Sequence, residues 1–209
     1  SHGAFDINIA DIVSAWGFGP AGARGVTRAP GMPSATARCA ASHALELALD
    51  TGQVRKRMPV SLDLSGIAKG FGVDELARVM DEFGVSAWLV GIDGEMRAKG
   101  TKPDGAMWAV AHERPDRHRR EAMGVIELQD MAVATSGNYR HVIEVEGKTL
   151  SHTIDTGSAR PLDNDVASVT VLASTCMEAD AWATAFMVMG LDKALPVARS
   201  NRLDAIVVL

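Results

Sequence analysis

The residues of this chain that best fit metal chemistry are Asp180 and Thr184, which stand four positions apart in a segment with helical spacing. An i, i+4 pair places both side chains on one face of a helix, so both oxygens can point at one ligand. Magnesium prefers hard oxygen ligands and usually takes some of them from substrate phosphates, and the small neighbours Ala181, Ala183 and Ala185 leave room for such a ligand. The same spacing fits a solvated aspartate beside a threonine that bonds back to its own helix, so spacing leaves both interpretations open.

A second segment with chemical potential is Asp63-Leu64-Ser65-Gly66-Ile67-Ala68-Lys69-Gly70, which follows an expected strand and opens an expected helix. Glycine lets the backbone approach a ligand closely, and the N–H groups at a helix start favour phosphate. Lys69 adds a positive charge at this point. The spacing is not that of a P-loop, and a plain strand-to-helix turn with a surface lysine explains the same residues.

Two further polar segments carry side chains that fit acid–base work or hydroxyl binding. Ser151-His152-Thr153-Ile154-Asp155 places a histidine beside an expected strand end, where it can serve as an acid, a base or a phosphate donor. Thr135-Ser136-Gly137-Asn138-Tyr139-Arg140 follows an expected strand and holds the only tyrosine of the chain. A structural histidine and a polar turn remain compatible with these patterns, so neither segment assigns a function by itself.

The elements that must position these side chains are helices towards both ends of the chain and strands in its middle. Apolar spacing predicts helices at 8–16, 35–49, 74–83, 176–189 and 192–199, with a loop at 19–34. Thr175 and Glu178 have capping-box spacing at the start of the helix that carries Asp180. Short apolar or β-branched runs predict strands around Val54 and at 60–64, 87–92, 108–112, 125–128, 131–134, 141–146, 148–151, 166–173 and 205–209. Strands bracketed by helices, without a regular βαβ repeat, predict an α+β fold.

Composition excludes some classes of function. The 209 residues are 47% hydrophobic and 22% charged, as in an ordinary globular protein, and the net charge of −5 argues against a nucleic-acid partner, which needs a basic face. No apolar run approaches the roughly 20 residues of a membrane span, and no signal-peptide pattern opens the chain, so neither an anchor nor a signal is expected within it. Cys39 and Cys176 stand far apart and outside any CxxC pair, and we expect free thiols.

In their order along the chain, these segments resemble the ApbE family, the FAD:protein FMN transferases once called thiamine-biosynthesis lipoproteins. The resemblance runs from the first residues to the last strand through eight segments. They are Gly3–Asp6, Trp16–Pro20, Asp63–Gly70 with Asp74, Gly91–Arg97, Thr135–Arg140, Ser151–Asp155, Ser168–Ala173, and Glu178–Thr184 with Met187–Gly190. Three places depart from the family pattern: the turn at 155–161, the segment Gly91–Glu95 where the family more often has a double glycine, and Ala183 where some relatives carry an acidic residue.

The resemblance implies one ApbE-like domain over residues 1–209, with mixed sheets, flanking helices, FAD in a cleft and Mg2+ at the FAD pyrophosphate. The implied metal ligands are the backbone carbonyl of Gly66 and the side chains of Asp180 and Thr184. Asp180 and His152 are the residues implied in catalysis, since His152 matches a family histidine near the reacting phosphate. The implied FAD contacts are Ala4, Phe5, Asp6, Asp63, Lys69 and Ile154.

The implied reaction is the Mg2+-dependent transfer of FMN from FAD to a threonine hydroxyl of a target flavoprotein, with release of AMP. Two alternatives use the same residues: an FAD pyrophosphatase with water as the nucleophile, giving FMN and AMP, and a flavin-binding protein without turnover. The resemblance further implies a periplasmic or inner-membrane-anchored lipoprotein whose target is a membrane redox complex subunit or another flavoprotein. It also leads us to expect that the family's N-terminal portion, with a Met-Gly-Thr segment and part of the FAD site, is missing ahead of the first residue.

Overall fold

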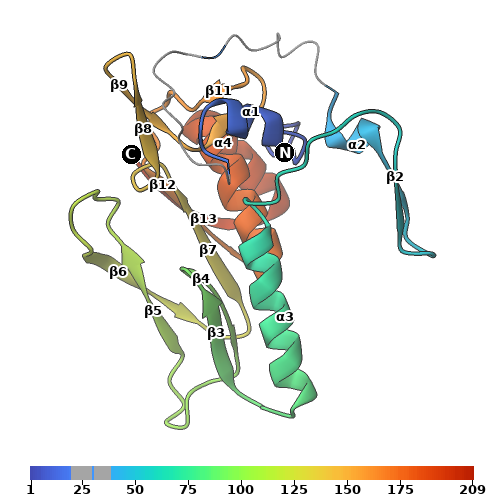
Figure 1. Cartoon of the computed structure of the whole chain (residues 1–209). Helices are drawn as coiled ribbons and strands as arrows, with labels where there is room; N and C mark the ends of the chain where they lie inside the picture. The colour runs from blue at the N-terminus through green and yellow to red at the C-terminus, as the bar shows by residue number, and fades with distance from the viewer. Residues whose placement is uncertain (20–29, 31–38) are drawn as a thin grey trace. The chain divides into compact units, whose positions relative to one another are not determined.

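The computed structural model describes residues 1–19, 30 and 39–209, and the chain divides into two compact units (Figure 1). Unit 1 comprises Ser1–Leu64 and His141–Asp163, and unit 2 comprises Ser65–Arg140 and Asn164–Leu209. The single domain expected over residues 1–209 stays a prediction. Apart from Gly19 and Pro30, the loop expected at 19–34 lies outside the described residues, as do residues 35–38 of the helix expected at 35–49.

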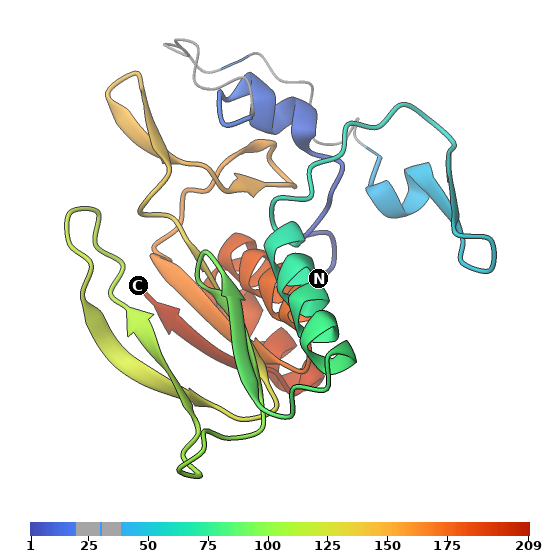
Figure 2. The same cartoon turned by 60° about the horizontal axis from the view of Figure 1, so that its bottom comes forward.

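Unit 2 is built on a five-stranded antiparallel sheet in the order β13-β12-β7-β4-β3 (Figure 2). Along the chain its strands are β3 (Trp88–Ile92), β4 (Glu95–Lys99), β7 (Ala132–Gly137), β12 (Ser168–Ala173) and β13 (Asp204–Val208). Four of these strands lie where the sequence predicted them, whereas β4 was missed. The strand was missed because charged residues alternate along it and do not look like residues of a covered sheet face. Two of them form ion pairs on the helix-covered face: Glu95 with Lys69 and Arg97 with Asp74.

Helices α3 (Ala68–Glu82) and α4 (Cys176–Asn201) pack on one face of this sheet and against each other (Figure 1). The helix expected at 74–83 therefore begins earlier, at Ala68. The N-terminus of α4 is capped as its sequence predicted, since Thr175 Oγ1 accepts a hydrogen bond from the Glu178 N–H at 3.3 Å. Gly190 breaks α4 with φ 70° and ψ 167°, which confirms the two successive helices expected at 176–189 and 192–199.

The two helices also cap each other's N-termini. Asp74 of α3 accepts hydrogen bonds from the backbone N–H groups of Cys176 and Met177, each at 2.9 Å. In return, Asp180 of α4 accepts one from the Gly70 N–H of α3 at 2.9 Å. The helices approach so closely that a Cβ on Gly70 would lie 2.4 Å from the Cys176 carbonyl oxygen. This reciprocal capping fixes the start of α3 against α4, and such a cap typically stabilises by about 1 kcal/mol.

The other face of the sheet is covered by the hairpin of β5 (Trp108–Glu113) and β6 (Ala122–Leu128), with Ala98, Val110, Leu128 and Val133 at the centre of the contact. Polar groups are buried there as well. His112 Nε2 bonds Thr170 Oγ1 at 3.1 Å, and Thr170 Oγ1 bonds Thr135 Oγ1 at 2.8 Å. Burial lowers the pKa of His112. Thr135 thus belongs to a structural network on this face.

The described residues of unit 1 form α1 (Ala10–Ala15), α2 (Ala41–Ala44) and three antiparallel strand pairs. The pairs are β1 (Leu45–Ala48) with β2 (Gln53–Lys56), β8 (Val142–Val145) with β9 (Lys148–Ser151), and β10 (Ile154–Asp155) with β11 (Arg160–Pro161). A small core of Ile12, Trp16, Ile154 and Ala159 joins α1 to the last pair. Trp16 Nε1 donates a hydrogen bond to the Ala159 carbonyl at 3.1 Å, which fixes that junction.

Two expectations for unit 1 were wrong. The helix expected at 35–49 ends at Ala44 and continues as strand β1, because the leucines that suggested a helix also alternate, and Leu45–Ala48 pairs with β2. Residues 60–64 form no strand, although one was expected. Their backbone instead bonds the N-terminal segment, with the Ala10 N–H donating to the Ser61 carbonyl at 3.0 Å and the Asp63 N–H to the Ile7 carbonyl at 2.8 Å.

The mixture of helices and antiparallel strands confirms the α+β class predicted from the sequence. Cys39 and Cys176 are free thiols, as expected. Within residues 1–19 and 39–209, no helix combines the length and the apolar character needed to cross a membrane.

Candidate metal and phosphate site

The N-terminus of α3 meets α4 around the buried carboxylate of Asp180, which is only 3% exposed. Oδ2 of Asp180 is engaged by the Gly70 N–H, and Oδ1 has no hydrogen bond to any described residue. Burial raises the pKa of Asp180, while the Gly70 N–H and the charge of Lys69 act in the opposite direction. The aspartate is therefore anchored through one oxygen and has the other one for a ligand, which excludes the alternative of a solvated aspartate.

Thr184 follows one helical turn after Asp180 and is partly buried against the sheet. Its Oγ1 lies 3.1 Å from Ser136 Oγ on β7. The bond runs to the sheet and not back along the helix, so Asp180 and Thr184 share the inward face of α4, as their spacing predicted. Ser136, which the sequence placed in a polar segment of undecided role, is the hydroxyl that orients Thr184.

Lys69 lies in the first turn of α3 and forms an ion pair with Glu95 on β4, with 2.5 Å between Nζ and Oε1. Glu95 is 1% exposed, and its second oxygen, Oε2, is buried without a hydrogen-bond partner in the part of the chain that the structure describes. Burial raises the pKa of Glu95 and the nearby charge of Asp180 raises it further, against the opposing effect of Lys69. No role was predicted for Glu95 from the sequence. The available signal was the alternation of the charged residues Glu95, Arg97 and Lys99 with Met96 and Ala98.

These contacts set two buried carboxylates, Asp180 and Glu95, against the single ammonium of Lys69. A divalent cation would balance the excess negative charge, and the N–H groups at the start of α3 favour an anion such as phosphate. Gly66 lies in the turn at 65–67 that leads into α3, where its carbonyl belongs to the same segment. Among the residues described, no group of three or more His, Cys, Asp or Glu side chains can hold a metal by itself. The oxygens of Asp180 and Thr184 are donors of the hard type that magnesium prefers, and magnesium completes its shell with water and phosphate oxygens.

The predicted catalytic histidine, His152, belongs to unit 1. Its backbone N–H donates to the His141 carbonyl at 3.0 Å, and Nδ1 lies 3.2 Å from the same oxygen. The ring makes edge contacts with Phe18 and His141, at centroid distances of 6.4 Å and 5.4 Å. Local contacts thus hold the imidazole in one orientation, and its role in catalysis stays a prediction.

Two of the FAD contacts predicted in unit 1 have structural duties there. Asp6 Oδ1 accepts hydrogen bonds from the backbone N–H groups of Asn8 at 2.8 Å and Ala41 at 3.1 Å, so Asp6 caps α2. The side chain of Ile154 is 3% exposed and packs in the core of unit 1.

The other three FAD contacts predicted in unit 1 are Ala4, Phe5 and Asp63, and each is partly buried. The Asp63 N–H donates to the Ile7 carbonyl, which ties its segment to the N-terminal residues. For all the residues assigned to FAD in unit 1, contact with the flavin stays a prediction.

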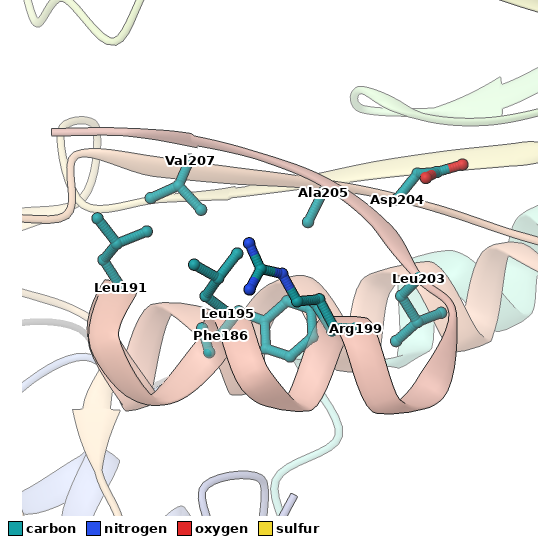
Figure 3. Close-up of a pocket in the computed structure, with 10 residues that line it drawn as sticks. Phe186, Leu191, Leu195, Arg199, Leu203, Asp204, Ala205 and Val207 are labelled. Atoms are coloured by element: carbon teal, nitrogen blue, oxygen red, sulfur yellow. The ribbon is translucent and has the colours of Figure 1, made fainter.

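A separate apolar pocket of about 210 Å³ lies in unit 2, between the second half of α4 and β13 (Figure 3). Leu191, Leu195 and Val207 face into it, with Arg199 and Asp204 as its charged residues. None of the residues predicted to bind metal or FAD lines this pocket. Its lining does not fit phosphate chemistry, so it is not the candidate site.

Similarity to known proteins extends along the whole chain. The model of the ApbE family matches residues 1–207. The chain is 39% identical over 210 residues to an FAD:protein FMN transferase of Vibrio cholerae, covering 100% of this chain and 62% of that protein. It is 35% identical over 208 residues to an FAD:protein FMN transferase of Escherichia coli K12, covering 97% of this chain and 59% of that protein.

Solved structures of ApbE proteins also match the whole chain. The flavinyl transferase ApbE of Pseudomonas stutzeri, in its apo form, matches with a TM-score of 0.83 and 36% identity, over 100% of this chain and 64% of that one. The apbe protein of Thermotoga maritima matches with a TM-score of 0.85 and 27% identity, over 100% of this chain and 68% of that one. The chain thus spans about three fifths of the length of the curated relatives it matches.

Proposed function

The chain belongs to the ApbE family, and from that premise we propose that it takes part in the magnesium-dependent transfer of FMN from FAD to a threonine hydroxyl of a target flavoprotein. The observation that carries the proposal is the anchored carboxylate of Asp180. It is buried, bound through Oδ2 to the N-terminus of α3, and followed one turn later by Thr184. The names of the curated relatives support FAD as the substrate and a protein as the acceptor.

In the proposed reaction, the acceptor threonine oxygen forms a bond to the phosphorus on the FMN side of the FAD pyrophosphate. The bond from that phosphorus to the AMP oxygen breaks, AMP leaves, and the hydroxyl proton passes to a base. Reactions of this class are accelerated mainly by positioning and by neutralising charge. Asp180 is a candidate for the base as well as a ligand, because its carboxylate has an oxygen that can orient the hydroxyl or accept its proton.

The residues of unit 2 have distinct tasks in this proposal. The N–H groups at the start of α3 and the ammonium of Lys69 bind phosphate oxygens. Asp180, Thr184 and the Gly66 carbonyl would hold the cation. Magnesium, when bound, supplies charge neutralisation at the pyrophosphate. From the family resemblance alone, we assign to His152 the steadying of the leaving phosphate or the transfer of its proton.

The test is an assay with the purified protein, FAD, Mg2+ and a peptide carrying the Asp-Gly-x-Ser/Thr-Gly-Ala-Thr-like motif that the family modifies. We expect a flavinylated peptide by mass spectrometry, and a rate lowered at least about 100-fold in Asp180→Ala, as when a group that stabilises transition-state charge is removed. Asp192→Ala is the matched control, because Asp192 is an exposed carboxylate on the same helix. If wild type and Asp180→Ala leave the peptide equally unmodified, the transferase proposal fails.

Two other outcomes point to the alternative functions. Steady release of AMP without any modified peptide indicates an FAD pyrophosphatase. Bound FAD without release of AMP indicates a flavin-binding protein that does not turn over.

The compartment is a proposal from the family resemblance alone: the periplasm, or the inner membrane through a lipid anchor. Fractionation of cells that produce the protein tests it. Recovery in the cytoplasmic fraction would contradict it.

A further inference from the structure

The backbone and the side-chain direction of Glu95 are fixed by the elements around it. It opens β4 directly after the turn at Asp93 and Gly94, whose φ values of 48° and 109° are both left-handed, and it pairs with Ile92 across the hairpin. An Asp-Gly pair favours such tight turns, so the backbone at Glu95 has little freedom. On the same face of β4, Arg97 is bound to Asp74 of α3. The Glu95 carboxylate therefore points to the helix-covered face, where Lys69 meets it.

The hydrogen bonding of Glu95 is half complete. Lys69 satisfies Oε1, whereas Oε2 is buried and has no hydrogen-bond partner within residues 1–19 and 39–209. Leaving a buried acceptor unsatisfied typically costs about 1–3 kcal/mol, and more for a charged group. The nearest positive charge is already used, and the Asp180 carboxylate adds a second negative charge close by. Without a ligand, this arrangement would lower the stability of the folded state. A bound hydrogen-bond donor would satisfy Oε2 and remove that cost.

We propose that Glu95 is a positioning residue of the metal site: Oε1 fixes the Lys69 ammonium beside Asp180, and Oε2 accepts a hydrogen bond from a water on the divalent cation. The inference rests on the proposed function for the presence of that cation. Magnesium keeps several of its waters when few protein groups bind it, and those waters need acceptors. Carboxylates behind the direct ligands orient such waters and commonly set the affinity of the site.

The experiment measures Mn2+ binding as the probe, by the electron paramagnetic resonance signal of free Mn2+ in a titration of the purified protein with FAD. Glu95→Gln retains the side-chain shape and one acceptor for Lys69, but its amide cannot accept at both oxygen positions. We expect Mn2+ affinity to fall by about 10- to 100-fold, the usual effect of removing a partner behind the ligands. Glu127→Gln is the matched control, because it removes one negative charge from an exposed site in the same unit and should leave affinity unchanged.

A second variant tests the position of the Glu95 carboxylate separately from its charge. Glu95→Asp keeps the charge and withdraws the carboxylate by one methylene, so we expect a similar loss of Mn2+ affinity. If both variants bind Mn2+ as wild type does, the role of Glu95 is overturned while the proposed function stands. A change in urea unfolding with Mn2+ affinity intact would overturn it too, since that is what a structural ion pair predicts. If wild type with FAD binds no Mn2+, the cation of the proposed function and the role of Glu95 fall together.

Discussion

The two units of the protein hold the residues of interest for the site in opposite ways. In unit 2, Asp180 and Glu95 are buried carboxylates, each with one oxygen engaged and the other without a partner among the described residues. In unit 1, Asp6 accepts hydrogen bonds from backbone N–H groups, and the side chain of Ile154 packs in the core. A buried carboxylate that lacks a hydrogen-bond partner for one oxygen can bind a ligand there. A residue whose hydrogen bonds or packing are complete within its own unit mainly stabilises that unit. On this basis we expect the metal chemistry in unit 2 and mainly structural effects from Asp6 and Ile154.

The largest effect should follow from closing the space between α3 and α4 with Gly70→Ala. Its Cβ would lie 2.4 Å from the Cys176 carbonyl, and backbone atoms cannot move aside as a flexible side chain does. We expect the free energy of unfolding to fall by about 3 kcal/mol and FMN transfer to be lost, because the Gly70 N–H no longer anchors Asp180.

The matched control for Gly70→Ala is Gly124→Ala, where a Cβ meets nothing within 4 Å. Urea denaturation should show less than about 0.5 kcal/mol of change for this control. Equal stabilities of the two variants would contradict the close approach of the helices.

A smaller effect is expected in unit 1 from Ile154→Val, which removes one methylene from the core around Trp16 and Ile12. We expect a loss of about 1 kcal/mol in urea denaturation, with the Mn2+ affinity of the FAD-loaded protein unchanged. A fall in Mn2+ affinity at constant stability would contradict this difference between the units, because it would show that Ile154 acts on the metal site and not only on the stability of unit 1.

The smallest effect concerns His112, a buried polar group of unit 2 that lies on the other face of the sheet and has its partner in Thr170. Because burial lowers its pKa in the folded state, the unfolded chain takes up this proton at a higher pH. The stability due to neutral His112 is complete above the ordinary histidine pKa of about 6.5 and is lost as the pH falls from there towards the lowered value.

Replacing His112 by Gln should therefore flatten the decline of stability as the pH falls below about 6.5. His118→Gln, at an exposed position, is the control and should keep the wild-type slope. Parallel slopes for the two variants in urea denaturation would show that burial does not act on His112.

Local sequence signals were sufficient for much of unit 2. The spacing of Asp180 and Thr184, the cap at Thr175 and the stop at Gly190 all depend on contacts within one helix, and all agree with the structure. Strand β4 and the proposed role of Glu95 were missed, because the charges of Glu95 and Arg97 become explicable only when helix α3 supplies Lys69 and Asp74, which lie 26 and 23 residues earlier in the sequence.

Non-local contacts also explain the failures in unit 1. Leu45–Ala48 fits a helix or a strand equally well until β2 pairs with it. Residues 60–64 have strand-like composition, but the N-terminal segment takes their backbone bonds at Ser61 and Asp63. Neither partner can be read from the segment itself.

The measurement that tests the central claim most directly is the rate at which Asp180→Asn forms flavinylated peptide and AMP from FAD in the presence of Mg2+. Asparagine keeps an oxygen for the Gly70 N–H, so the helix cap remains while the metal-binding charge is lost. We predict equal amounts of AMP and flavinylated peptide for wild type, a rate at least about 100-fold lower for the variant, and unfolding free energies within about 1 kcal/mol of each other. Wild-type rates in Asp180→Asn would contradict the assignment of the metal site to unit 2.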